Sequence, residues 1–200
     1  MIRILTSSSR APLAAVRLMP MTVGALLTAA ALAGGGAAAT SDAQIMVSGG
    51  SLSVTSPNFQ GATAMLDGTA QTISTSPATP WAAVDARGTG AAWSVTASAT
   101  DLVSTGTPNR VIPSSALAIT TGAVTAGTGA DPVTGMTGST AAPFTVPTGA
   151  GQTNVTVMDA PAPHRGSYTF TPTLDITVPP TAQPSYAGSP YTATLTVTIS

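Results

Sequence analysis

Proline and glycine interrupt the chain after residue 40 too often for long helices. The 200 residues include 20 glycines and 17 prolines, and no window of helical length keeps a three-to-four residue apolar period. Short runs instead alternate apolar and polar side chains, as strands with one buried face do. Threonine and valine, which favour pleated strands, are frequent in these runs. The sequence therefore predicts an all-β protein.

Eight of these runs are predicted to be strands, separated by turn residues. Their number favours an antiparallel β-sandwich of the immunoglobulin-like kind over a closed barrel, although periodicity alone leaves both architectures open. Residues 56–69 and 121–151 are predicted to be loops, and the second loop is expected to hold a short strand near 143–146. The predicted strands are 51–55, 70–75, 81–86, 92–99, 111–120, 153–157, 167–178 and 190–199.

Residues 1–39 are predicted to be a secretory signal peptide. Three arginines and no acidic residue precede an apolar run at 18–33, and small residues follow it, so we expect cleavage after Ala39, with Ala43 as the alternative position. The apolar run has about sixteen residues and contains Pro20, whereas a membrane-spanning helix needs about 20. We therefore expect a leader helix that is removed on export, a flexible start at 40–50, and one domain at 51–200 with no transmembrane span.

The charge of the mature chain argues against nucleic acid as a partner. Without the leader, three arginines face seven aspartates, a formal charge of about −4, and there is no lysine or glutamate. Nucleic-acid binding needs a basic surface that displaces counterions from phosphates. Charged residues are only 6% of the chain, but 43% of residues are hydrophobic, which favours a folded core over disorder.

The composition also removes several kinds of chemistry. The absence of cysteine rules out disulfides, thiolate metal sites and cysteine nucleophiles together. An exported fold without disulfides must depend on packing and on sheet hydrogen bonds. The single histidine, His164, lies in a proline-flanked turn and is expected to be exposed rather than catalytic. Asp85 and Asp101 are better explained as turn or strand-end residues than as a paired acid site, and no calcium-loop or phosphate-loop pattern occurs.

The segment at 84–96, VDARGTGAAWSVT, is the more specific of two informative stretches. Asp85 can accept local backbone hydrogen bonds, and Gly88 and Gly90 permit positive φ, so we expect a hairpin turn at 87–90 with Trp93 on the returning strand. Trp93 is expected to be a core aromatic, with surface contact to a glycan as the alternative. Trp81 is expected to pack beside it or to cap the sandwich.

The second informative stretch contains LDITVP at 174–179, YAG at 186–188 and YTATLTVTI at 191–199. From about residue 50 to the end, the two stretches together resemble the WxL-type surface domains of Gram-positive bacteria. In that family an early W-x-L motif follows a D-x-R/T-G-T-G turn, and a Y-x-G-Y-x-A-x-L-x-W-x-L stretch closes the domain. Here Trp93 is kept with Val95 in place of leucine, and Val197 and Ile199 stand in place of the closing tryptophan and leucine.

The resemblance implies a function at the cell surface. Domains of this family are held to attach non-covalently to peptidoglycan through the two motifs, which implies Trp93, Val95, Val197 and Ile199, together with Trp81, as ligand-binding residues. We therefore expect a secreted, non-catalytic domain associated with the cell wall, without a cofactor or metal ion. The alternative is a subunit of a surface complex or polymer that binds a companion protein instead of a glycan.

Overall fold

Strands in this protein bury every second side chain, as the alternating sequence predicts. β3 (Trp81–Asp85) buries its first, third and fifth side chains, and β4 (Trp93–Ala99) begins in the same way. The computed structural model describes residues 45–144 and 154–200, so the predicted signal peptide helix lies outside the described residues. In the described part of the chain, no helix has the length and apolar character needed to cross a membrane.

Residues 49–200 form one unit of three four-stranded sheets and a hairpin, with antiparallel pairing throughout the described strands. The first sheet has the order β1 (Leu52–Thr55), β3, β12 (Gly166–Phe170) and β8 (Val124–Ala126). The second has the order β10 (Ala142–Pro143), β7 (Leu117–Thr120), β13 (Thr173–Val178) and β2 (Gln71–Thr75). The third has the order β14 (Leu195–Ile199), β4, β11 (Val155–Ala160) and β9 (Thr137–Gly138), and the hairpin joins β5 (Leu102–Ser104) to β6 (Arg110–Ile112).

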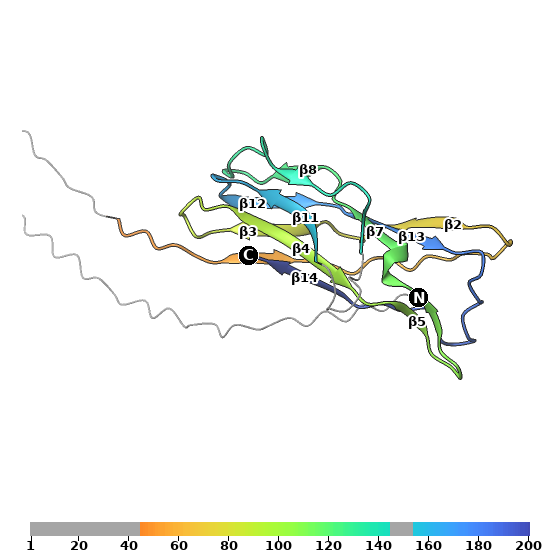
Figure 1. Ribbon diagram of the computed structural model, residues 1–200. Coiled ribbons are helices and arrows are strands. Elements are labelled where there is room, and N and C mark those ends of the chain that lie inside the picture. The colour runs from red at the N-terminus through yellow and green to blue at the C-terminus, as the bar shows by residue number, and fades with distance from the viewer. Residues whose placement is uncertain (1–44, 145–153) are drawn as a thin grey trace, which may run out of the picture. The chain divides into compact units, whose positions relative to one another are not determined.

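The first two sheets follow one another as a single long layer. Only Thr171 and Pro172 separate β12 from β13, and β3 and β2 flank these two strands on one side while β8 and β7 flank them on the other. Figure 1 shows β12 and β13 in succession, with β3 beside the first and β2 beside the second. Because proline has no backbone N–H to donate, the ladder is interrupted at this point.

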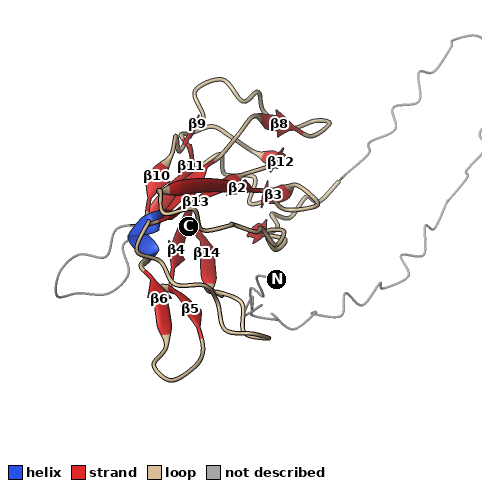
Figure 2. Cartoon of the chain, turned by 90° about the vertical axis from the view of Figure 1, so that its right-hand side faces the viewer, coloured by secondary structure: helices blue, strands red, loops and turns tan. Residues whose placement is uncertain are grey.

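The third sheet packs against this long layer to make a sandwich. In Figure 2, β4 and β14 lie in a layer separate from β2 and β13. The ring of Trp93 on β4 contacts the ring of Tyr168 on β12, with centroids 5.6 Å apart, so side chains of the two layers meet directly. The predicted all-β, antiparallel sandwich is therefore confirmed.

Aromatic side chains fill the space between the layers. Many core positions hold alanine, such as Ala83, Ala97 and Ala160, which bring little volume. Buried leucine, isoleucine, valine and methionine side chains add volume, and the rings of both tryptophans, all three phenylalanines and one of the three tyrosines are the largest groups in the core: Phe59, Trp81, Trp93, Phe144, Tyr168 and Phe170. These rings bury the most apolar area per residue and compensate for the small alanines around them.

Prolines divide two of the predicted strands. The run predicted at 111–120 is split at Pro113 into β6, a short 3-10 turn at Ser114–Ala116, and β7, which pairs in a different sheet. The run predicted at 167–178 is split into β12 and β13 at Pro172. In both cases the run is extended overall, but a missing N–H ends one ladder and lets the chain start another.

The hairpin predicted at 81–99 is wrong. β3 and β4 belong to different sheets, so the turn at 87–90 carries the chain from one layer of the sandwich to the other. Asp85, Gly88 and Gly90 nevertheless behave locally as expected, because both glycines have positive φ and the carboxylate accepts a backbone hydrogen bond. The local turn signal does not say whether the returning strand pairs with its predecessor or faces it.

The predicted loop at 121–151 contains more structure than expected. It holds β8, β9 and β10, and the last of these, at Ala142–Pro143, occupies the place of the strand predicted near 143–146, of which residues 145 and 146 lie outside the described part. β5 was not predicted, and of the run predicted at 190–199 only β14 is a strand. β5, β8, β9 and β10 have two or three residues each and depend on their partners rather than on a strong pattern of their own, whereas β14 has the alternation that predicted it.

Trp81 is the side chain whose loss should cost this core most. It is 1% exposed, contacts Phe59 and Phe170 edge-on, and donates its indole N–H to the carbonyl of Pro57. We expect Trp81→Ala to lower the free energy of unfolding by about 3–5 kcal/mol, measured by urea denaturation. Val111→Ala, at a 53% exposed position, is the control and should change it by less than about 0.5 kcal/mol. A similar effect of both substitutions would contradict this account of the core.

Candidate functional site

The crossover between the two layers is closed by an ion pair. Arg87 donates from Nε to Asp85 Oδ1 at 2.9 Å and from Nη2 to Oδ2 at 3.0 Å, and its backbone N–H also donates to Oδ1. Arg87 Nη2 also donates a hydrogen bond to the carbonyl of Ala91 at 2.9 Å. The Asp85 side chain is fully buried while that of Arg87 is 27% exposed. The hydrogen bond from Arg87 holds the pKa of Asp85 below its usual value, in spite of burial.

Trp93 is the first buried residue after this crossover. It is 2% exposed, and its indole N–H donates to the carbonyl of His164 at 2.8 Å. The ring packs on Tyr168 of the opposite layer. A glycan cannot stack on a ring that is covered on this scale, so the structure places Trp93 in the core, as the first of the two expectations had it.

His164 is buried, contrary to the expectation of an exposed loop residue. It is 4% exposed, its ring packs edge-on against Tyr168, and its Nδ1 and Nε2 face the carbonyl oxygens of Pro161 and Thr134. A histidine that acts as a general base would need a hydroxyl or water at one nitrogen, and carbonyls occupy both positions. The turn that follows Pro161 and Pro163 places the His164 ring against Tyr168 and its carbonyl at the indole N–H of Trp93.

A second ion pair beside this cluster was not predicted. Arg165 donates from its backbone N–H and from Nε to Asp131 Oδ2, at 2.8 and 2.9 Å, which closes the loop before β9 onto the start of β12. The hydroxyl of Tyr168 lies 3.0 Å from the carbonyls of both Asp131 and Arg165. Burial raises the pKa of Tyr168, and the hydrogen bond from Arg165 lowers that of Asp131. Arg165 and Asp131 are 34 residues apart, so no local pattern marked them as partners.

The two stretches that resemble W-x-L motifs lie side by side. β14 pairs with β4 so that Ile199 is opposite Val95 and Val197 is opposite Ala97, and the backbone of Ser200 bonds to that of Ser94. Val95 is buried, while Val197 and Ile199 on the outer strand of the sheet are half-buried. The structure therefore brings Val95, Val197 and Ile199 to one seam, and Trp81, a buried residue of the facing layer, lines a small hollow together with Val197.

Two aspartates weighed as an acid pair serve separate structural roles. Asp85 binds Arg87, and Asp101 accepts the backbone N–H of Ser114 at 2.7 Å. Among the described residues, no group of three or more histidine, cysteine, aspartate or glutamate side chains is placed to hold a metal ion.

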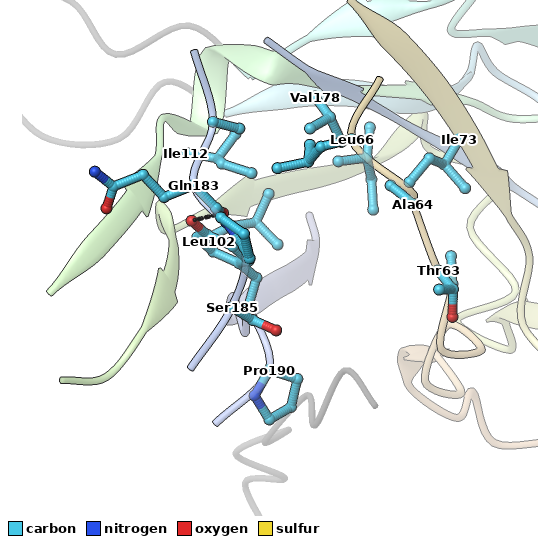
Figure 3. Close-up of a pocket in the computed structure, with 15 residues that line it drawn as sticks. Thr63, Ala64, Leu66, Ile73, Leu102, Ile112, Val178, Gln183, Ser185 and Pro190 are labelled. Atoms are coloured by element: carbon cyan, nitrogen blue, oxygen red, sulfur yellow. Dashed lines mark hydrogen bonds between the residues drawn. The ribbon is translucent and has the colours of Figure 1, made fainter. Parts of the chain in front are cut away.

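An apolar groove lies at the far end of the long layer from the crossover. It has a volume of about 240 Å³, and Figure 3 shows it between a loop at 62–66, the ends of β2 and β13, and the segment 182–191. Its floor is formed by buried aliphatic residues and its rim by more exposed ones. The floor includes Leu102, Ile112, Ile176 and Val178, and the rim includes Thr63, Leu66, Gln183 and Ser185. No charged side chain lines the groove.

Apolar side chains are also exposed just before the domain begins. Ile45, Met46 and Val47 are 90%, 96% and 86% exposed. Exposed apolar side chains forgo the favourable free energy that their burial would contribute. Single exposed apolar residues are ordinary, but a contiguous apolar surface marks a site of association. From the sequence, 40–50 was predicted only as a flexible start, and this feature was missed. The signal for it is the run of three large apolar residues, Ile45, Met46 and Val47, in a stretch with few charges.

Comparison with known proteins adds no relative to these observations: no protein-family model, no curated protein and no solved structure matches the chain. The resemblance to WxL-type domains therefore stays a prediction that rests on the residues quoted above.

The burial of both tryptophans can be measured by fluorescence quenching. These are the two tryptophans of the chain, so Trp81→Phe leaves Trp93 as the sole indole. We expect the emission of this variant to resist iodide in the native protein and to become accessible in urea, because the Trp93 ring is packed between layers. Trp93→Phe, which isolates Trp81, should behave alike. Strong quenching of native Trp93 would contradict its position in the core.

The Asp85–Arg87 pair predicts a specific dependence of stability on pH. Because the pKa of Asp85 is lowered in the folded state, its contribution is complete above the unfolded value near 4 and is lost as the pH falls below that value. We expect Asp85→Asn to cost about 2 kcal/mol of unfolding free energy at pH 7, measured by urea denaturation. That cost should shrink between pH 5 and pH 2, whereas the exposed Asp159→Asn should show little cost at either end. A cost that does not change with pH would refute the ion pair as its source.

Proposed function

We propose that this chain is an exported, non-catalytic domain of the bacterial cell surface that acts by binding companion surface proteins. The observation that carries the proposal is where the aromatic and apolar side chains lie. Trp81 and Trp93, the residues expected to contact a glycan, are 1% and 2% exposed. Exposed aliphatic residues and methionine lie at 45–47 and around the groove, and a contiguous exposed apolar surface marks a site of association.

The location of the protein is part of the same proposal. The arginines and the apolar run of the predicted leader support export. The chain has no cysteine, so side chains packed between the two layers stabilise the domain without disulfides. The ion pair of Asp85 with Arg87 and the buried hydrogen bond from Trp93 to the carbonyl of His164 support a structural role for the segment that resembles a W-x-L motif. A wall-binding function through Trp93 itself finds less support, because its indole N–H and its ring are both engaged inside the protein.

The proposal is tested by offering the exported protein two kinds of surface. Purified cell-wall sacculi stripped of protein should retain little of it, whereas chemical cross-linking on intact cells should join it to another surface protein. Aromatic stacking on sugars does not depend on surface proteins, so stripping would leave such binding intact. Retention on stripped sacculi, reduced by Val197→Asp or Ile199→Asp in folded protein, would restore the wall-binding alternative.

Substitutions of Trp93 need care in this experiment. Trp93→Ala leaves a cavity in the core and reports on folding, so Trp93→Phe is the informative variant and its urea midpoint must be measured alongside. We expect Trp93→Phe to bind the same companion as the wild-type protein, because the ring does not reach the surface.

A further inference from the structure

We propose that copies of this chain associate head to tail, with Ile45–Met46–Val47 of one copy seated in the apolar groove of the next. The inference rests on the proposed function and names the partner surface: a second copy of this chain. Two observations made independently meet here: three consecutive exposed apolar residues at 45–47 and a groove lined by apolar side chains.

The two surfaces match in size and charge. An engineered apolar cavity of about 150 Å³ holds a benzene molecule, so a groove of about 240 Å³ has room for one or two aliphatic side chains. The floor of Leu102, Ile112 and Val178 is apolar, and no side chain of the groove lining or of the segment 43–50 is charged. Seating Ile45, Met46 and Val47 therefore buries apolar surface on both sides without burying a charged side chain.

The length of the chain shows that the segment must come from another copy. The backbone is tied to the crossover end of the domain where Gly50 donates to the carbonyl of Ala86 at 2.7 Å. From Gly50 back to Ile45 the chain reaches at most about 18 Å when fully extended. However the segment is turned, it stays within this distance of that anchor.

The groove lies farther away than this reach. Asp85 is paired with Gly166 at one end of the long layer, and Gln71 is paired with Val178, which lines the groove, at the other. The run from Gly166 to Val178 spans roughly 40 Å at the usual rise of a strand. Figure 1 shows β3 and β12 toward one end of this layer and β2 and β13 toward the other. The segment therefore cannot enter the groove of its own copy.

Such a contact uses different surfaces on the two partners and so repeats. Heterologous contacts of this kind produce rings or open filaments according to whether the rotation closes. Either expected cleavage position, after Ala39 or after Ala43, leaves Ile45 to Val47 on the mature protein close to its free end. A contact made by a short segment is small, so the association is weak and depends on concentration.

The experiment measures the mass of the exported protein by sedimentation velocity over a wide range of concentration. We expect wild-type mass to rise above that of a monomer, and Met46→Asp or Leu66→Asp to weaken the association roughly tenfold or more, since burying one aliphatic side chain contributes at least that factor. Ser48→Asp adds the same charge to the segment, and Val133→Asp adds it at a site as exposed as Leu66, 37% in both cases. Both controls should associate like the wild type.

Mixing the two defective variants gives the decisive result. Met46→Asp retains its groove and Leu66→Asp retains its segment, so the mixture should form one-to-one dimers and nothing larger, at concentrations where each variant alone is still monomeric. A peptide with the sequence of residues 43–50 should dissociate wild-type assemblies, and the same peptide carrying Met46→Asp should not. Urea midpoints confirm that each variant is folded.

The outcomes separate this inference from the proposed function. Wild-type protein that stays monomeric at every concentration, yet is cross-linked on cells to a different protein, overturns self-association and leaves the proposed function standing. Retention on stripped sacculi overturns the proposed function whatever the mass. Association that Met46→Asp leaves unchanged overturns the assignment of the segment.

Discussion

The packing of a few aromatic rings between the two layers is the constraint on which this structure depends. The core strands contribute many alanines, and there is no disulfide to restrict the unfolded chain. Trp81 with Phe59 and Phe170 fills one part of the core, while Trp93 with Tyr168 joins the facing layers in another. Because small side chains cannot fill the distance of about 10 Å between packed sheets, these rings set where the layers can approach.

The polar groups near Trp93 are consequences of that packing. Bringing Trp93 under the layer of β12 also brings its indole N–H inside, and the carbonyl of His164 satisfies it. Asp85 is buried by the same closure and is compensated by Arg87, which remains partly exposed. Buried donors and charges cost free energy when they lack partners, so these hydrogen bonds are needed to stabilise the crossover. The segment from Asp85 to Trp93, which resembles a binding motif in sequence, therefore joins two sheets in the structure.

The exposed surface is therefore the region that indicates how a partner could bind. With the tryptophans inside, the large apolar side chains that the described residues expose are aliphatic or methionine: Ile45, Met46, Val47, Met65, Leu66, Val111 and Val133, of which Leu66 lines the groove. They lie at positions that a search for catalytic or aromatic residues passes over. In a domain with so few charges, apolar contact and strand pairing are the main means of recognition that the composition provides.

The sequence by itself determined the all-β class, most strand positions and the turn conformation at Gly88 and Gly90, because alternation and glycine geometry act over a few neighbouring residues. It also excluded disulfides, because no cysteine is present, so the fold depends on packing and on sheet hydrogen bonds. Only the tertiary structure decided that β3 and β4 lie in different layers, that His164 is buried, and that Arg165 meets Asp131. These outcomes depend on which distant segments pair and on what covers each face, and a local pattern contains neither the register between remote strands nor the shape of the opposite layer.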